Sequence, residues 1–281
     1  MRCAGSATCT SRCSISAPAP GLVAIDFDGT LLRSDGTLSD RTVRAVHGVV
    51  ETGVRVMVVT GRPPRWLAPI AELLGHRGVA IAANGALVVD LATSEVLDST
   101  HLDVATARVV IDRLRTAFPA TTFGVERPDG FAHERGYPRG IRNSERMPQV
   151  AYADSVAELL AEPPVKILAR MSGIDIDAAA AQAITVLDGT ASVYFSGADL
   201  LEIAAADVSK ASTLARVAAR WGIGAEMVMA FGDMPNDIPM LEWAGHAVAV
   251  ANAHPTVRAI VDEVTASNDD DGVARILERL L

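Results

Sequence analysis

Two short apolar runs that end in acidic residues limit what this chain can fold into more than any other feature. The run LVAIDF at residues 22–27 leads into Asp28, and the run MVMAF at residues 227–231 leads into Asp233. Runs this short and apolar are typical of parallel strands that are buried on both faces. Because ligands of parallel sheets bind beyond the carboxyl ends of the strands, we expect both sets of acids at one functional edge.

The segments around these runs alternate between helix and strand patterns. Residues 39–51 and 65–74 have helical periodicity, and residues 54–60 and 79–82 are strand-like. The alternation returns after about Leu201. A β-α-β-α-β order is typical of an α/β fold with a parallel sheet.

The middle of the chain has a different pattern. Alternating runs at residues 86–102 and 121–135 predict two hairpins, and residues 103–118 and 175–187 predict helices. This mixture predicts an α+β insert that interrupts the parallel sheet. We therefore expect a core domain and an inserted cap domain, which take residues 21–85 and 196–281 and residues 86–195, respectively.

The N-terminal segment, residues 1–20, differs in composition from the rest of the chain. It is rich in Ser, Ala and Cys and lacks the continuous apolar region of a signal peptide. All the cysteines of the chain, Cys3, Cys9 and Cys13, lie here, without the fourth ligand that a metal cluster would need. We expect a disordered leader. A body without cysteine fits a reducing cytosol, so we expect a cytoplasmic protein.

Charge and hydropathy exclude two classes of partner. The chain has 25 Lys and Arg against 34 Asp and Glu, a formal net charge of -9, and no basic stripe of the kind that binds nucleic acid. No apolar run approaches the roughly 18 residues of a membrane span. A small phosphorylated metabolite remains a suitable partner, because a bound cation sets the local field. The oligomeric state does not follow from these features.

The segment DFDGT at residues 26–30 can carry phosphoryl chemistry. Asp26 and Asp28 are two residues apart, and side chains at this spacing on an extended segment point the same way. One carboxylate can attack phosphorus while a neighbouring carboxylic acid protonates the leaving group. An acidic strand end followed by glycine is also common in simple turns, so the pentapeptide alone leaves both interpretations open.

The segment GDMPND at residues 232–237 repeats this arrangement after the second run. Asp233 and Asp237 bring the number of acids expected at the edge to four, and without a counter-ion they would repel one another. A hard cation such as Mg²⁺ suits this oxygen set. The alternative, an Asn/Asp-rich turn that caps the next helix, is common for one such motif but less so for two.

Two further segments of the chain can bind phosphate. Thr60 and Gly61 end the second predicted strand, where a hydroxyl and free backbone N–H groups can hold phosphate oxygens or cap the following helix. Lys210 precedes a predicted helix and can neutralise both the nucleophile and the phosphate, although most single lysines are solvated surface charges.

In this order, the segments DFDGT, Thr60, Lys210 and GDMPND resemble the motifs of the haloacid dehalogenase superfamily. The stretches LEIAAADVSKASTL and MVMAFGDMPNDIPML, with ANGA at residues 83–86, resemble its Cof-like phosphatases. The resemblance covers roughly residues 21–281 and implies a Rossmann-like core with a C2-type cap inserted between the second and third motifs. The chain departs from the family pattern at Asp207, where relatives often have glycine, and at Ala211, where glycine is frequent after the lysine.

The resemblance implies a role for each motif residue. Asp26 would be the nucleophile that forms an aspartyl-phosphate, and Asp28 the general acid, which the dehalogenases of the superfamily do not need. Asp26, Asp233, the Asp28 backbone carbonyl and Asp237 would hold Mg²⁺ and its water shell. Asn236 would contact phosphate or orient the lysine. The residues implied to bind the substrate phosphate are Thr60, Gly61, Lys210 and Asn236.

We therefore expect a Mg²⁺-dependent phosphatase of small phosphorylated metabolites, with sugar phosphates foremost and flavin mononucleotide or pyridoxal phosphate as alternatives. A phosphomutase with the same motifs, or a phosphometabolite sensor without turnover, are the other hypotheses. We expect hinges near residues 83–86 and 195–201. A basic cluster in the cap could attract an anionic substrate; its members are Arg139, Arg142 and Arg146.

Overall fold

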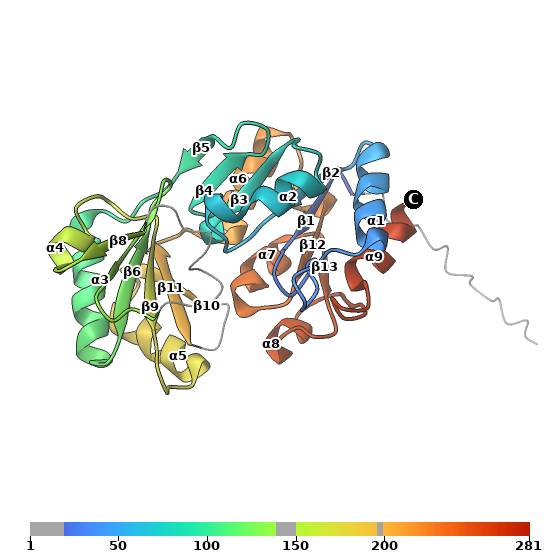
Figure 1. Cartoon of the computed structure of the whole chain (residues 1–281). Helices are drawn as coiled ribbons and strands as arrows, with labels where there is room; N and C mark the ends of the chain where they lie inside the picture. The colour runs from blue at the N-terminus through green and yellow to red at the C-terminus, as the bar shows by residue number, and fades with distance from the viewer. Residues whose placement is uncertain (1–19, 139–149, 196–198) are drawn as a thin grey trace, which may run out of the picture.

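The computed structural model describes residues 20–138, 150–195 and 199–281, which form two main sheets with a smaller one between them (Figure 1). The leader cysteines and the three arginines of the basic cluster lie outside the described residues. Among the residues that are described, no helix combines the length and apolar character needed to cross a membrane.

The first sheet contains five parallel strands in the order β14-β13-β12-β1-β2. Its centre is β1 (Leu22–Ile25) beside β12 (Val228–Gly232), and both strands are buried along their whole length, as the apolar runs predict. Ile25 pairs with Phe231, so the two strands end side by side. This register brings the residues that follow the two strands to the same edge of the sheet.

Helices cover both faces of this sheet. In Figure 1 its strands lie between α1 and α9 on one side and α7 on the other. α1 begins after Ser39, whose side chain accepts a hydrogen bond from the backbone N–H of Thr42, and its buried positions repeat with helical spacing. The remaining elements of this unit are β2 (Arg55–Val58), β13 (His246–Ala249), β14 (Glu263–Val264), α1 (Asp40–Glu51), η1 (Pro64–Trp66), α2 (Ala68–Leu73), α6 (Lys210–Arg220), η3 (Ala225–Met227), η4 (Pro235–Asp237), α7 (Ile238–Trp243), α8 (Pro255–Arg258), α9 (Gly272–Leu277) and η5 (Glu278–Leu280).

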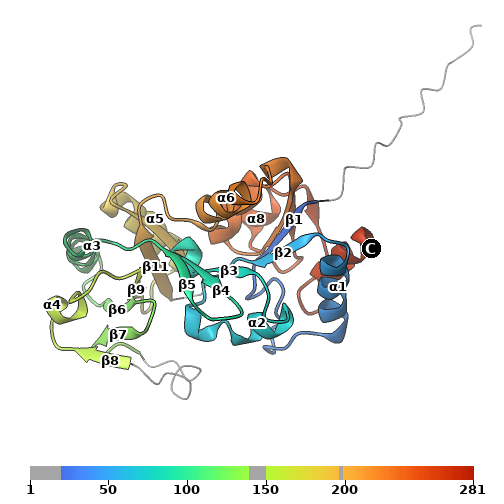
Figure 2. The same cartoon turned by 90° about the horizontal axis from the view of Figure 1, so that it is seen from above.

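A three-stranded sheet of β3, β4 and β5 lies between the parallel sheet and the cap (Figure 2). Residues of β4 pack in the same apolar core as the parallel sheet. β4 and β5 pair antiparallel, which confirms the first predicted hairpin. The elements are β3 (Val79–Ala82), the one-turn helix η2 (Ala83–Gly85), β4 (Leu87–Asp90) and β5 (Val96–Ser99).

The cap contains a six-stranded sheet in the order β10-β11-β9-β6-β7-β8. All its pairs are antiparallel except β7 with β8, and the β6–β7 pair confirms the second predicted hairpin. α3 and α5 pack on one face over a core of their own. The elements are α3 (Val104–Ala117), β6 (Thr122–Glu126), β7 (Phe131–Glu134), β8 (Val150–Ala153), α4 (Val156–Leu159), β9 (Lys166–Arg170), α5 (Ile176–Leu187), β10 (Ala191–Phe195) and β11 (Leu200–Ala205).

This architecture confirms the predicted fold class, an α/β core with a parallel sheet and an inserted α+β cap. The chain crosses between the two sheets after Ser99 and after Ala205, later than the predicted boundaries at 86 and 195. β11 pairs with β9 and β10 over residues that the sequence analysis assigned to the returning core. The division into domains stays a prediction, which these pairings refine.

Candidate active site

Three acids converge where β1 and β12 end. Asp26 directly follows β1, Asp233 directly follows β12, and Asp237 closes the short helix η4. One carboxylate oxygen of each lies within 4.8 Å of the others, and all three residues are buried. The shared sheet edge that the two apolar runs predict therefore gathers these carboxylates as expected.

Lys210 enters this cluster from the first position of α6. Its Nζ donates to Asp26 Oδ1 and to Asp237 Oδ1, each at 2.6 Å, and the residue is 1% exposed. The start of α6 can approach this closely because Gly85 has no side chain. A Cβ on Gly85 would lie 2.1 Å from the Ser209 carbonyl oxygen. Lys210 is thus a buried partner of the acids, and the alternative of a solvated surface charge is wrong.

The acid cluster has more negative than positive charge. Burial raises the pKa of Asp26 well above its usual value, against the lowering effect of Lys210 and with a further rise from Asp237. Burial and the Asp237 carboxylate raise the pKa of Asp233 to about 6. Burial alone would lower the pKa of Lys210, but Asp237 and Asp26 outweigh it and raise that pKa. One ammonium does not balance three carboxylates.

The donor set fits a divalent cation. Carboxylate oxygens are the ligands that hard cations prefer. A cation would offset burial and the mutual repulsion of the carboxylates, which together raise the pKa values of Asp26 and Asp233. The carboxylates are also held in place: Thr30 Oγ1 donates to Asp233 Oδ1 at 2.8 Å, and Asp237 Oδ2 accepts from the N–H of Asp233 at 3.0 Å. Gly29 passes so close that a Cβ there would lie 2.5 Å from Asp233 Oδ2.

Asp28 lies apart from this cluster. Its side chain is 53% exposed and accepts two hydrogen bonds from Arg62, at 2.7 and 2.8 Å. The Arg62 guanidinium in turn lies 4.6 Å above the Phe27 ring. The expectation that Asp26 and Asp28 point the same way required an extended segment, but β1 ends at Ile25 and the chain turns, with Gly29 at φ 81°.

The predicted phosphate-binding positions line the same edge of the sheet. Thr60 follows β2, is buried, and accepts a hydrogen bond from the Arg62 N–H at 3.1 Å. Asn236 is buried beside the acids, and its Nδ2 donates to Asn84 Oδ1 at 3.1 Å. Gly61 packs against the same amide, since a Cβ on it would lie 3.0 Å from Asn84 Oδ1.

Sequence reasoning assigned no role to four residues around this site. Arg62 directly follows the predicted pair Thr60 and Gly61. Asn84 belongs to the segment ANGA, which contributed to the family resemblance and to an expected hinge but received no role of its own. The other two are charges inside apolar strand runs, and such a charge is the signal that could have revealed them, because a buried charge requires a partner. The four are Arg62, Asn84, Lys166 and Glu202.

A partly buried ion pair joins the cap to the core. Arg65 of η1 donates to both carboxylate oxygens of Glu126 on β6. Glu126 is 2% exposed, and burial raises its pKa although Arg65 lowers it. The Arg65 guanidinium also lies 5.1 Å from the Trp66 ring centroid. The charges of this pair balance.

The structure brings residues of the four motifs DFDGT, Thr60, Lys210 and GDMPND to one edge of the sheet, and a comparison with known families agrees with the resemblance that these motifs carry. A family model described as haloacid dehalogenase-like hydrolase matches residues 23–277. The chain belongs to this family. The matched range includes the acid cluster, Lys210 and the inserted cap, and it confirms the resemblance to the superfamily and its Cof-like phosphatases.

Relatives in this family are named as phosphatases. A 5-amino-6-(5-phospho-D-ribitylamino)uracil phosphatase of Bacillus subtilis is 28% identical over 267 residues, covering 92% of this chain and 97% of the relative. A phosphoglycolate phosphatase of Methanothermobacter thermautotrophicus is 29% identical over 263 residues, covering 92% and 98%. The structure of BT1666 from Bacteroides thetaiotaomicron, described among the phosphatases of this superfamily, superposes with a TM-score of 0.79 at 25% identity, covering 98% of this chain and 99% of that one. The chain is accordingly an enzyme of the phosphoric monoester hydrolase class.

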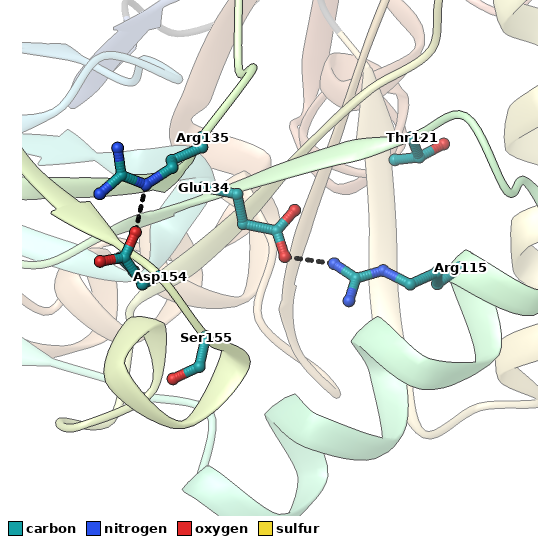
Figure 3. A pocket seen from close by; sticks show the side chains of 7 residues that line it. Arg115, Thr121, Glu134, Arg135, Asp154 and Ser155 are labelled. Atoms are coloured by element: carbon teal, nitrogen blue, oxygen red, sulfur yellow. Dashed lines mark hydrogen bonds and ion pairs between the residues drawn. The ribbon is translucent and has the colours of Figure 1, made fainter.

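A separate pocket of about 300 Å³ lies in the cap, among α3, β7 and the start of α4 (Figure 3). Its charged side chains already form ion pairs, Arg115 with Glu134 and Arg135 with Asp154. It contains none of the family motif residues. The chemistry of this haloacid dehalogenase-like hydrolase therefore belongs to the acid cluster and not to this pocket.

Proposed function

We propose that the chain is a Mg²⁺-dependent phosphatase that hydrolyses small phosphorylated metabolites through an aspartyl-phosphate on Asp26. The observation that carries this proposal is the buried cluster of three carboxylates around one lysine. Such a cluster has the oxygen donors for Mg²⁺, and it holds one carboxylate beside an ammonium that can also contact phosphate. The ligands would be Asp26, Asp233, Asp237 and the Asp28 backbone carbonyl.

The chain's own residues supply the two half-reactions. A carboxylate oxygen of Asp26 attacks phosphorus, the bond from phosphorus to the leaving oxygen breaks, and Asp28 donates a proton to that oxygen. Asp28 then takes a proton from water as this water attacks the aspartyl-phosphate, which releases inorganic phosphate and regenerates Asp26. Bound Mg²⁺ supplies neutralisation of the phosphate charge. Lys210, Thr60, Gly61 and Asn236 position the phosphate.

Arg62 controls when Asp28 can act. In the present conformation the carboxylate of Asp28 is held by Arg62. Both carboxylate oxygens of Asp28 accept hydrogen bonds from Arg62, so neither is free to contact the leaving oxygen of a substrate. The pair must therefore open when substrate binds, which frees Asp28 to face the leaving oxygen.

Substrate choice belongs to the cap. The relatives named above act on phosphate esters of small molecules, and sugar phosphates are the foremost candidates for this chain, with flavin mononucleotide and pyridoxal phosphate as alternatives. A phosphomutase would use the same motif residues but return the phosphoryl group to its substrate. Product analysis separates the two: a phosphatase yields inorganic phosphate, and a mutase yields an isomer.

The aspartyl-phosphate can be trapped. A reaction mixture with Mg²⁺ and a turned-over phosphate ester is quenched and treated with borohydride, which reduces an acyl phosphate to an alcohol. Mass spectrometry of the peptide that contains Asp26 should then find homoserine at this position, and only when substrate is present. Phosphate release with an unmodified Asp26 peptide, under conditions that reduce a synthetic acyl phosphate, would contradict the proposal.

A further inference from the structure

Two buried contacts join the cap sheet to the core beside the phosphate-binding positions, and the mechanism above uses neither. Lys166 on β9 and Glu202 on β11 form an ion pair, and each residue is 3% exposed. Lys166 Nζ also donates to the Gly61 carbonyl oxygen at 2.9 Å. Glu202 Oε2 accepts from Asn84 Nδ2 at 2.9 Å. Both contacts thus run from a charged cap residue to a core loop.

The Glu202 carboxylate determines how two amides are oriented. A carboxylate only accepts hydrogen bonds, so Asn84 turns its Nδ2 toward Glu202 and its Oδ1 toward Asn236. Asn236 must then donate through its own Nδ2. Its Oδ1, which is buried and has no hydrogen-bond partner among the described residues, is left for a donor within the active site. The charge on a cap strand therefore determines which group Asn236 offers.

The backbone that carries Asn84 is strained, which supports a functional role for its position. Ala83 and Asn84 have φ values of 52° and 57°, in the left-handed region that side chains other than glycine and asparagine rarely adopt. Strain of this kind persists where the surroundings determine the conformation, and it is frequent at functional sites. Here the turn places the Asn84 amide between Gly61, Asn236 and the cap.

We propose that Lys166 and Glu202 are positioning residues of the phosphate site. Lys166 fixes the Gly61 peptide, and Glu202 fixes the Asn236 amide through Asn84, so docking of the cap on the core completes the phosphate site. This proposal rests on the proposed function, because it takes Gly61 and Asn236 as phosphate-binding residues. Neither Lys166 nor Glu202 touches substrate in this account.

Binding of inorganic phosphate in the presence of Mg²⁺, measured by calorimetry on the full chain, tests the proposal without turnover. The test variant is the double substitution Lys166→Met with Glu202→Gln, which removes both charges of the pair. A glutamine can donate as well as accept, so the amide orientation is no longer fixed. Loss of ordered hydrogen bonds to a charged ligand should weaken the phosphate Kd about tenfold or more. Mg²⁺ binding should be unchanged, because the three acids are untouched.

A matched control removes the ion pair between Arg65 of the core and Glu126 of the cap. Arg65→Met with Glu126→Gln also deletes two balanced charges, but among the described residues these two side chains form no hydrogen bond or ion pair with Gly61, Asn84 or Asn236. The control should keep the phosphate Kd within about twofold of wild type. An equal loss in both double variants would assign the effect to cap docking in general and overturn the proposal.

A second variant covers the case in which the first does not fold. Asn84→Gly keeps the ion pair and suits the left-handed backbone, yet it breaks the connection to Asn236. It should weaken phosphate binding and lower kcat/KM by a similar factor for every substrate, whereas a residue that contacts the leaving group would change the ranking of substrates. If this variant bound phosphate as tightly as wild type, the proposal that Glu202 positions Asn236 through Asn84 would be wrong. A wild type that binds phosphate but hydrolyses no ester would refute the proposed function alone.

Discussion

Two clusters of charged residues lie near the boundary between core and cap, and they differ in net charge. The acid cluster of the core holds three carboxylates and one ammonium. The cap–core cluster holds two carboxylates, Glu126 and Glu202, with two cations, Arg65 and Lys166. The first has excess negative charge and the second is balanced.

The difference in charge balance separates a site that needs a bound cation from one that does not. Burial of unbalanced charge is costly, and a chain that retains it gains from a counter-ion taken from solution. Burial of balanced, hydrogen-bonded charge needs no such ion. We therefore expect Mg²⁺ to act on the acid cluster and to leave the cap–core cluster unaffected, and the following experiments test this contrast.

Loss of the Lys210 ammonium should have the largest effect on the free energy of unfolding. Lys210→Met leaves three buried carboxylates without their cation, and breaking a buried ion pair in this way costs about 3–5 kcal/mol. Denaturant unfolding of the metal-free variant should show this loss, and Mg²⁺ should restore a substantial part of it. A variant as stable as the wild type in the absence of metal would show that the acids are not charged as a group.

Loss of the lysine from the cap–core cluster should also lower stability, but Mg²⁺ should not restore it. Lys166→Met leaves Glu202 buried without its ammonium and should also cost about 3–5 kcal/mol. Mg²⁺ should restore no part of this loss beyond its effect on wild type. Adding Glu202→Met should recover stability, because balanced removal of a buried pair is often neutral. If Mg²⁺ restored the stability of Lys166→Met, the proposed difference between the two clusters would be wrong.

Metal binding should stabilise the unmodified chain by a smaller amount. At a Mg²⁺ concentration one hundred times its Kd, linkage gives about 2.7 kcal/mol. Thermal unfolding with and without EDTA measures this shift, and Asp233→Asn should reduce it. An identical shift in Asp233→Asn would place the bound ion elsewhere.

The pH dependence of the metal-free chain should be the most gradual of these effects. The pKa of Asp233 is raised to about 6 from an ordinary value of 3.8. Because the folded state holds this proton more tightly, the stabilising contribution is complete below pH 3.8 and is lost as the pH rises through about 6. The slope is at most about 1.4 kcal/mol per pH unit. Unfolding free energies of wild type minus those of Asp233→Asn isolate it, and a difference that rises with pH in this window would contradict the assignment.

Local sequence patterns were sufficient to predict much of the core. Apolar runs predicted β1 and β12, helical periodicity over residues 39–51 predicted α1, and alternating runs predicted both hairpins. These features depend on neighbours in sequence, which periodicity and capping chemistry describe. The convergence of Asp26 with Asp233 followed from the single rule that parallel strands share a carboxyl edge.

The contacts that sequence reasoning missed are long-range. Glu202 meets Asn84 only because β11 pairs with β9 in the cap sheet, and no local pattern reveals that register. Asp28 turns toward Arg62 because the extended segment ends early. Asp207, a position at which we expected a departure from the family pattern, has φ 65°, in the left-handed region that favours glycine.

The most direct test of the account is phosphate release from p-nitrophenyl phosphate and a panel of sugar phosphates, by wild type and Asp26→Asn, with Mg²⁺ and with EDTA. The substituted amide keeps the size of the side chain but cannot attack phosphorus. The account predicts release that requires Mg²⁺ and that falls by a factor of about 10³ or more in Asp26→Asn. Release by Asp26→Asn at the wild-type rate, or release unaffected by EDTA, would contradict it.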